Sequence, residues 1–226
     1  MNYTAQYLDF GLIEYKEAWN RQEVLNQQIR DHKDAQTNEP GKLIFCEHPH
    51  VFTMGKSGQQ NNLLINDEFL KRIDASYYQS NRGGDITYHG PGQIVGYPIF
   101  DLEALNMGVK EYIHKLEQAI INTLAQYSIV ATQLEGATGV WLETATPRVR
   151  KICAIGVKIS KAVTMHGFAL NVNTNLNYFS YINPCGFIDK GVTSMEKEIG
   201  KKPDFEEVKQ RLKEEIVKVF HLSMQN

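Results

Sequence analysis

Apolar residues near the start of the chain recur every three or four positions, which is the spacing of one face of a helix. The pattern predicts an amphipathic helix over about residues 11–30, carried by Leu12, Tyr15, Ala18, Trp19, Leu25 and Ile29. A polar run ending in Pro-Gly predicts a loop over 31–42, and the apolar run at 43–48 predicts a buried strand. Residues 53–66 are rich in glycine and asparagine, so we expect a surface loop there.

The second half of the chain changes from helical to strand-like spacing. Apolar residues at helical spacing predict a second helix over about 109–127. Short runs of β-prone residues follow at 129–135, 138–143, 151–160 and 163–172. Because only the tripeptide Ser-Lys-Ala joins the last two runs, we expect them to form an antiparallel hairpin.

The end of the chain carries a clear helix start. Asp204 can cap a helix over about 204–221, with Glu207 completing a capping box. The buried stripe of this helix would be Phe205, Val208, Leu212, Ile216 and Phe220. Helices and antiparallel-looking strands mix without a regular βαβ repeat. The sequence therefore predicts an α+β fold, with one domain over 1–226 and a mixed, largely antiparallel sheet flanked by helices.

Composition narrows the classes of protein. The 226 residues are 42% hydrophobic and 22% charged, near the globular average, so the chain can bury a sizeable core. A net charge of −2 argues against a broad basic surface for nucleic acid or membrane. We find no apolar run long enough to span a bilayer and no signal peptide. The three cysteines lack a CxxC spacing, so we expect no disulfide framework and no metal site, in a reduced, cytoplasmic protein.

Residues 81–98 are unusually rich in glycine. Such density indicates tight turns or the close approach of a ligand to the backbone, and a twisted hairpin with two turns would also account for it. The segment is neither a Walker loop nor a dinucleotide fingerprint, because no Gly-Lys-Ser/Thr follows and Pro91 interrupts the required helix. Within it, His89 can be a hydrogen-bonded structural group or part of a site, and Arg82 can serve only to anchor the loop.

Lys151 precedes a predicted strand in which every second residue is apolar. In an extended strand it shares a face with Cys153, Ile155 and Val157, where desolvation would lower its pKa and make it a base near neutral pH. The alternative is a frayed strand end with Lys151 in water. A lysine beside a thiol would also favour the thiolate.

Cys185 lies between Pro184 and Gly186, in a stretch with little charge. Proline restricts the backbone before it and glycine removes a side chain after it, an arrangement that suits an exposed thiol approached by another molecule. Cys153 is the rival nucleophile, although a cysteine inside a strand usually belongs to the core.

Several motifs occur together in one order. They are RGGDITYHGPGQIVGYPIFDL, GATGVW, RKICAIGVKI, MHGFALNVN and NPCGF, with EHPHVFTMGKSG as a weaker match upstream. This set, within about residues 43–196, resembles the lipoyl (octanoyl) transferases of lipoate biosynthesis. The resemblance implies the catalytic fold shared by biotin and lipoate protein ligases. It also implies transfer of an octanoyl group from acyl carrier protein to a specific lysine of a lipoyl domain, through a cysteine thioester and without ATP or any other cofactor.

The resemblance also implies roles for residues that match the family motifs. Cys185 corresponds to the acyl-thioester nucleophile, and Lys151 to the lysine that lowers the pKa of that cysteine and acts as acid and base. The substrate-binding positions implied are Arg82, Gly83, Gly84, Asp85, Ile86, Thr87, Tyr88, His89, Ala154, Ile155, Gly156, Gly167, Phe168 and Ala169.

The partners that the resemblance implies are octanoyl-acyl carrier protein as donor and lipoyl-domain proteins as acceptors, and we expect a monomer. Arg148, Arg150, Lys201 and Lys202 are candidates to receive the carrier protein, or form a solvated basic surface. Three other functions stay open at this point: an ATP-dependent lipoate-protein ligase, an acyl thioesterase, and an acyl-binding module without enzymatic activity.

Overall fold

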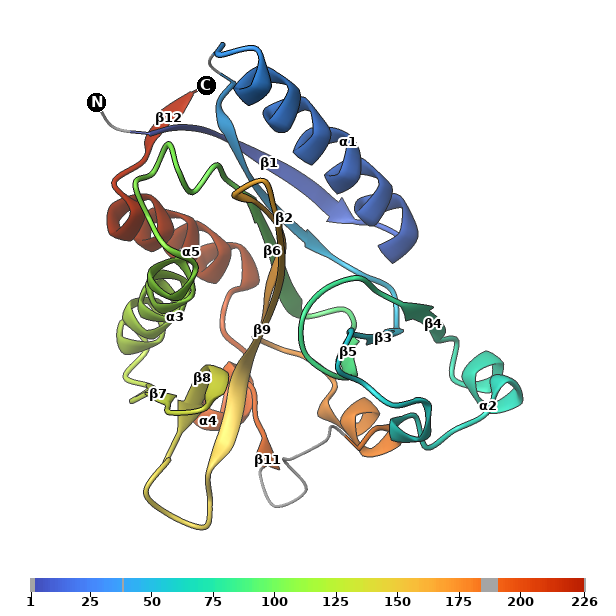
Figure 1. The fold of residues 1–226 in the computed structure, drawn as a ribbon. Coiled ribbons are helices and arrows are strands. Elements are labelled where there is room, and N and C mark those ends of the chain that lie inside the picture. Colours follow the sequence, from blue (N-terminus) through green and yellow to red (C-terminus); the bar gives the residue numbers. More distant parts are fainter. Residues whose placement is uncertain (1–2, 38, 184–190, 226) are drawn as a thin grey trace.

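The computed structural model describes residues 3–37, 39–183 and 191–225. Within them the main sheet has nine strands, with helices on both faces (Figure 1). Eight strands lie in the order β12 (Ser223–Gln225), β1 (Thr4–Leu12), β2 (Gly41–Glu47), β6 (Gln93–Ile99), β10 (Val163–Asn171), β9 (Arg150–Ser160), β8 (Ala137–Leu142) and β7 (Thr132–Leu134), and β11 (Gly191–Val192) pairs with β9. Strand β1 is parallel to β2 and β12, and β11 to β9; the other pairs are antiparallel. The predicted α+β fold with a mixed, largely antiparallel sheet is confirmed.

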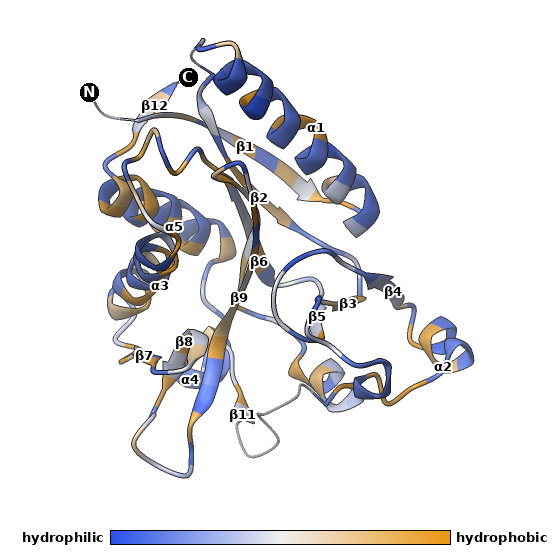
Figure 2. Ribbon diagram, viewed as in Figure 1, coloured by the Kyte–Doolittle hydropathy of each residue, from blue (hydrophilic) through white to orange (hydrophobic). Residues whose placement is uncertain are grey.

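The two faces of the main sheet support different helices. Leu43 and Phe45 of β2 belong to the core under α3 (Val109–Ala125) and α5 (Phe205–Phe220). Ile44 and Cys46, which point to the other face, belong to a smaller core with residues of α1 (Tyr15–Asp34). Figure 2 shows α1 as hydrophilic along most of its length, with only scattered hydrophobic positions. The larger and more apolar core therefore lies on the α3 and α5 side.

Helix α5 forms as its sequence predicts. The side chain of Asp204 accepts a hydrogen bond from the backbone N–H of Glu207 at 3.0 Å, which satisfies one of the amides at the helix start. Val208, Leu212, Ile216 and Phe220 are buried. The hairpin of β9 and β10 is also confirmed, and its turn places Lys161 and Ala162 at positive φ, as the two-residue turn of a twisted hairpin requires.

The N-terminal prediction needs correction. The helix predicted over 11–30 spans Tyr15–Asp34 instead, and residues 4–12 before it form β1. Strand β1 depends on neighbours far along the chain, because it pairs with β2 on one side and with β12 on the other. The predicted loop at 31–42 begins as helix, and Lys33 extends from this last turn to Asp101 at 2.9 Å.

A second sheet of three described strands stands beside the main one. Its order is β4 (Ser76–Gln79), β3 (Val51–Met54) and β5 (Thr87–His89), with α2 (Asp67–Arg72) and two 3₁₀ turns, Gln60–Asn62 and Leu176–Tyr181, around it. The alternative of a hairpin over 81–98 is wrong, because β5 pairs with β3 while β6 pairs within the main sheet. The predicted loop over 53–66 begins inside β3.

Short elements complete the fold. Helix α4 (Met195–Ile199) follows β11 directly, and the predicted helix over 109–127 is confirmed as α3. Among the described residues, no helix is long and apolar enough to cross a membrane.

Candidate active site

A cavity of about 430 Å³ lies where the two sheets meet, a size in the range of small-ligand sites. Strands β8, β9 and β10 contribute to its wall, as do β5 of the small sheet and the loop before it. Apolar groups such as Val95, Trp141 and Phe179 line it together with a few polar ones. The cavity can therefore hold an apolar chain and place its polar end against charged side chains.

Most of the predicted site residues meet in this cavity, although they come from three separate segments. Those on its wall are Arg82, Gly84, Asp85, Ile86, Thr87, His89, Lys151, Ala154, Ile155, Gly156, Gly167, Phe168 and Ala169. Gly83 and Tyr88 are not among the residues that line the cavity. Gly83 donates its N–H to the carbonyl of Val157 at 2.9 Å, and buried Tyr88 contacts His50 through its hydroxyl at 2.7 Å.

Lys151 reaches the cavity because of an irregularity in its strand. The pairing of β8 with β9 shifts register, so that Val140 faces Cys153 while the next residue, Trp141, faces Lys151. Ile152 and Cys153 are consequently both buried in the main core. The prediction that Lys151 shares the face of Cys153 is therefore wrong: the bulge turns Lys151 toward the cavity, whose wall also includes Ala154, Ile155 and Gly156.

Among the described residues, the ammonium of Lys151 contacts Thr138 and Trp141. Its Nζ donates to the carbonyl oxygen of Thr138 at 3.2 Å and lies 4.5 Å from the centre of the Trp141 ring. A carbonyl oxygen and the face of an indole both stabilise a positive charge. Lys151 is thus a positioned, partly buried cation on the cavity wall, rather than a frayed strand end in water.

Glycines let the loop before β5 pack directly on β9. A Cβ added at Gly156 would stand 2.8 Å from the carbonyl oxygen of Gly83, closer than such atoms approach. A Cβ at Gly167 would meet the Gly96 carbonyl oxygen of the neighbouring strand at 2.1 Å. These small residues line the cavity, but the space that their missing side chains leave is filled by protein backbone.

Arg82 is a buried cation at the base of this loop. Its guanidinium donates to the carbonyl oxygens of Thr53 at 2.6 Å and Gly83 at 3.0 Å, and to the Thr53 hydroxyl. Burial lowers the pKa of Arg82 from its ordinary value. Arg82 thus ties the loop to β3 through oxygens of Thr53 and Gly83, while it also forms part of the cavity wall.

His89 and two neighbouring histidines are buried and uncharged near neutral pH. Burial lowers the pKa of His89 and of His166 to about 3, and that of His48 to about 4. The Nδ1 of His89 donates to Oε1 of Gln93 at 2.8 Å, and its Nε2 lies 3.3 Å from the Thr53 hydroxyl. These imidazoles therefore serve as hydrogen-bonding groups. In the described part of the chain, no three His, Cys, Asp or Glu side chains are grouped to hold a metal.

Two of the three cysteines lie among the described residues. Cys46 and Cys153 are free and buried, and burial raises the pKa of both thiols. Cys153, the rival candidate for the nucleophile, is 0% exposed in the main core. Cys185 lies outside the described residues. Asn183 and Gly191, the described residues that flank segment 184–190, both line the cavity.

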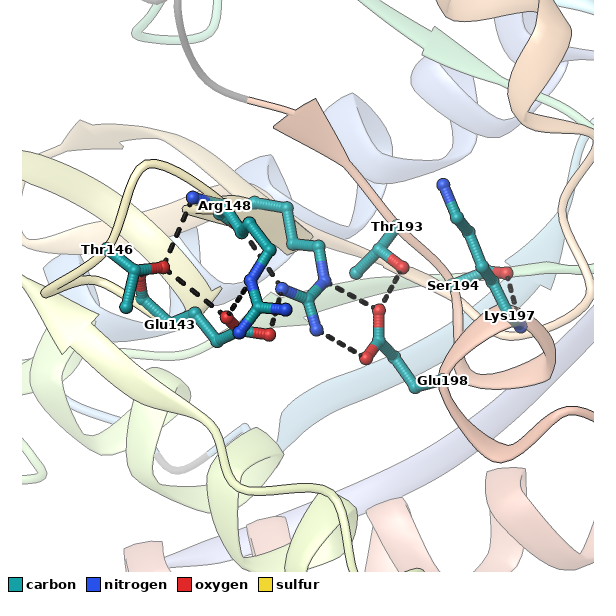
Figure 3. Close-up of polar contacts among 8 residues, drawn as sticks. Glu143, Thr146, Arg148, Thr193, Ser194, Lys197 and Glu198 are labelled. Carbon is teal, nitrogen blue, oxygen red and sulfur yellow. Dashed lines mark hydrogen bonds and ion pairs between the residues drawn. The ribbon is translucent and has the colours of Figure 1, made fainter.

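The start of β9 is held by a cluster of ion pairs (Figure 3). Arg150 donates to Glu143 at 2.6 Å and, through two nitrogens, to Glu198 at 2.7 and 2.6 Å. Hydrogen bonds with Glu198, then with Glu143, raise the pKa of Arg150, and the same contacts lower the pKa of both carboxyls. Thr193, whose N–H donates to the Lys151 carbonyl at 2.9 Å, adds a hydroxyl bond to Glu198.

This cluster changes the expectation for the basic residues near Lys151. The Arg150 side chain is 19% exposed and engaged on both sides, which favours a structural role. The side chain of Arg148 is 79% exposed and pairs with Glu143 at its Nε. Of the two arginines, Arg148 is therefore the one whose surface a partner can reach.

Sequence reasoning missed several residues of the wall. Tyr15, Tyr97, Trp141, Asn171 and Phe179 line the cavity and were not predicted. Trp141 belongs to the motif GATGVW, and this motif could have indicated that Trp141 lines the cavity. Tyr15 comes from α1, and no local pattern associates it with the loop at 82–89.

Comparison with known proteins agrees with this arrangement. Residues 14–217 match the family model described as the lipoyl protein ligase A/B catalytic domain. A protein named octanoyltransferase from Bacteroides fragilis (strain YCH46) is 57% identical over 209 residues, which is 92% of this chain and 95% of that protein.

Solved structures show the same fold. A bipartite lipoate protein ligase from Thermoplasma acidophilum superposes with a TM-score of 0.72 at 16% identity, covering 99% of this chain and 86% of that one. A biotin protein ligase from Aquifex aeolicus gives a TM-score of 0.54 at 13% identity, covering 96% and 70%. The fold expected from the resemblance is confirmed. The chain therefore belongs to the lipoyl protein ligase A/B catalytic domain family and, within it, to the octanoyltransferases, which are acyltransferases.

Proposed function

We propose that this enzyme moves an octanoyl group from acyl carrier protein to a lysine of a lipoyl domain, through a thioester on Cys185. The observation that carries the proposal is the position of Lys151, a cation on the wall of a largely apolar cavity whose rim includes Asn183 and Gly191. Asn183 and Gly191 are the described residues on either side of segment 184–190, which contains Cys185. The burial of Cys46 and Cys153 supports the same choice.

In the first step, Lys151 takes the proton of the Cys185 thiol and holds it as the ammonium that the Thr138 carbonyl and the Trp141 ring stabilise. The thiolate attacks the carbonyl carbon of the donor thioester. The tetrahedral intermediate collapses by breaking the bond to the carrier's sulfur. That leaving thiolate receives the proton from the Lys151 ammonium. One thioester replaces another, so the step needs no ATP and no other cofactor.

In the second step, Lys151 accepts a proton from the acceptor lysine and leaves it a neutral amine. The amine attacks the octanoyl-cysteine carbonyl, and collapse of the intermediate releases the Cys185 thiolate, which takes one of the two amine protons while the amide nitrogen keeps the other. Lys151 then releases its proton to the solvent. The product is an amide, which is more stable than a thioester. Because the reaction uses a free thiol, we place it in the reducing cytoplasm.

The apolar part of the wall suits the acyl chain. Ile86, Val95, Trp141, Ile155 and Phe168 line the cavity together with the small Ala154 and Ala169. Each methylene removed from water contributes about 0.8 kcal/mol, so a cavity of fixed length discriminates between chain lengths by a small factor for each carbon.

Intact-protein mass spectrometry tests the proposal. After mixing with octanoyl-acyl carrier protein, the enzyme should gain one octanoyl group, which peptide mapping assigns to Cys185. The adduct should disappear when an unmodified lipoyl domain is added, as the domain gains the same mass. Cys185→Ala should give no adduct, whereas Cys153→Ala, the matched control, should still acylate.

The other outcomes separate the competing functions. Octanoylation of the domain from free octanoate and ATP, without the carrier, would identify a ligase. Release of octanoate at a rate that does not depend on the domain would identify a thioesterase. Retention of full transfer activity by Cys185→Ala would refute the thioester intermediate.

A further inference from the structure

The peptide group between Thr138 and Gly139 is hydrogen-bonded on both sides. Its N–H, from Gly139, donates to Oε1 of Glu117 at 2.9 Å. Its carbonyl oxygen, from Thr138, accepts the Nζ of Lys151 at 3.2 Å. The N–H and C=O of a trans peptide point in opposite directions, so this one group lies between a carboxylate and an ammonium.

Glu117 is an unexpected residue for its place on α3. Leu116 and Ile120 on the same helix are fully buried in the main core, and Glu117 itself is only 7% exposed. A buried carboxylate is costly unless polar or charged partners compensate it. Burial raises the pKa of Glu117, whereas the Gly139 N–H, then the charges of His114 and Lys151, act in the opposite direction. Its described partners thus include the peptide that contacts Lys151.

Both the backbone conformation and the surroundings of residue 139 favour glycine. Its φ of +124° is a conformation that side chains rarely allow. An added Cβ would stand 2.6 Å from the Cys153 carbonyl oxygen and 3.3 Å from Cε of Lys151. The peptide therefore lies against the stem of the lysine, and its carbonyl oxygen is one acceptor for the ammonium.

We propose that Glu117 is a positioning residue for Lys151, acting through the Thr138–Gly139 peptide. The carboxylate holds the N–H, so the carbonyl oxygen faces the ammonium. Hydrogen bonds in a chain also polarise one another, so the negative charge strengthens the bond from Lys151. The catalytic consequence rests on the role proposed above for Lys151, but the positioning itself does not.

The test is an NMR titration of ¹⁵N-lysine-labelled enzyme, with Lys151→Met to assign the signal. Glu117→Gln keeps the size of the side chain and an oxygen for the Gly139 N–H, but removes the charge. We expect the Lys151 titration midpoint to fall by about 0.5–1 unit, less than the one to three units of a direct ion pair. Glu111→Gln is the matched control, since Glu111 lies on the same helix with a side chain 54% exposed.

Other titratable groups lie around Lys151, Glu117 and the Thr138–Gly139 peptide, and these groups are the same in both variants. They are His114 on α3 and Cys153 on β9, and on the cavity wall Arg82, Asp85, His89 and His166. A shift seen with Glu117→Gln and not with Glu111→Gln therefore reports the Glu117 charge. An unchanged midpoint in Glu117→Gln would overturn the proposal.

Activity measurements separate this proposal from the function on which it builds. In Glu117→Gln, the alkaline limb of the acylation rate should move to lower pH by the same amount, whereas a merely structural role would lower the rate equally at every pH. If Lys151→Met keeps full transfer activity while the titration still shifts, the proposed function fails and the positioning stands. If Lys151→Met abolishes transfer while the Lys151 titration midpoint is unchanged in Glu117→Gln, the proposed function stands and the positioning role of Glu117 fails.

Discussion

Two groups of polar side chains lie at or next to the cavity, and their surroundings favour opposite charge states. The histidine cluster, His48, His89 and His166, is buried, and burial lowers the pKa of each imidazole to about 3 or 4. The second group, called the lysine unit, consists of Lys151 with Trp141, Glu117 and the Thr138–Gly139 peptide. Its members stabilise the ammonium form of the Lys151 amine.

The comparison shows that burial alone does not make a proton-transfer site. The histidines accept and donate fixed hydrogen bonds and stay neutral near pH 7, so they shape and orient the cavity. In the proposed mechanism, the lysine is the group that holds and releases a proton. A histidine in a glycine-rich motif is the more obvious candidate base by residue type, yet the contacts favour Lys151.

Removing the amine should have the largest effect. Replacing Lys151 with methionine keeps the stem but loses the proton carrier, so the single-turnover rate of acylation should fall by about 10²–10⁴-fold. His89→Gln should lower that rate by only about fivefold, the cost of one neutral hydrogen bond. Rapid-quench mass spectrometry measures both rates. Equal losses in the two variants would remove the distinction between the groups.

Displacing the lysine without removing it should have the next largest effect. In Gly139→Ala, the new methyl meets the Cys153 carbonyl at 2.6 Å and the Lys151 stem at 3.3 Å. We expect a loss of about 1–3 kcal/mol in the free energy of unfolding and, since a shift of 1 Å can cost 10²-fold, a rate about 10–100-fold lower.

Gly108→Ala is the control for this variant. An added Cβ there meets nothing within 4 Å, so stability and rate should stay close to those of the unaltered enzyme. Urea unfolding and the acylation assay provide the two measurements. A Gly139→Ala enzyme with normal activity would show that the lysine tolerates a moved peptide.

The histidine cluster should make the free energy of unfolding depend on pH. Its folded-state pKa values lie below the ordinary 6.5, so the unfolded chain binds protons first as the pH falls. The stability is complete above pH 6.5 and is lost toward pH 4, at up to about 1.4 kcal/mol per pH unit for each histidine.

Two asparagine variants measure this contribution. His166→Asn should flatten the slope between pH 6.5 and 5, while His221→Asn should not, because His221 is exposed. Both positions have positive φ, 59° and 53°, which asparagine tolerates. Denaturant unfolding at several pH values gives the slopes, and identical slopes for both variants would contradict the assignment.

Removing the ion pairs that hold the start of β9, the strand that contains Lys151, should have the smallest effect. Arg150→Met removes the two hydrogen bonds that Glu198 accepts from Arg150, in a site where the Glu198 side chain is 15% exposed, so we expect a loss of about 1–2 kcal/mol. Arg148→Met, whose side chain is 79% exposed, should cost less than about 0.5 kcal/mol. A loss as large for Arg148→Met would mean that the cluster acts as a whole.

Local patterns predicted much of the fold. Helix α5 starts at its cap and buries its expected stripe, and the β9–β10 hairpin turns where its short connection requires. The motifs also contain most of the residues that line the cavity. These features depend on residues close together in the chain, where helix and strand periodicity acts directly.

Long-range pairing decided the rest. Strand β1 forms because it pairs with β2 and β12, although the spacing of apolar residues at its end predicts part of a helix. The face of β9 on which the Lys151 side chain lies depends on a register shift against β8. Strict alternation of side chains along β9 does not predict this shift. The partnership of Glu117 with Gly139 joins a helix to a strand 22 positions later.

The sequence by itself determined the class of fold, the family and the segments from which the site is built, because these follow from local periodicity and from motifs. Only the tertiary structure decided which side chains on those segments face the cavity and which charges lie near them. The physical reason is that register, bulges and burial arise from contacts between distant segments, and a shift of one residue reverses the face that a side chain occupies.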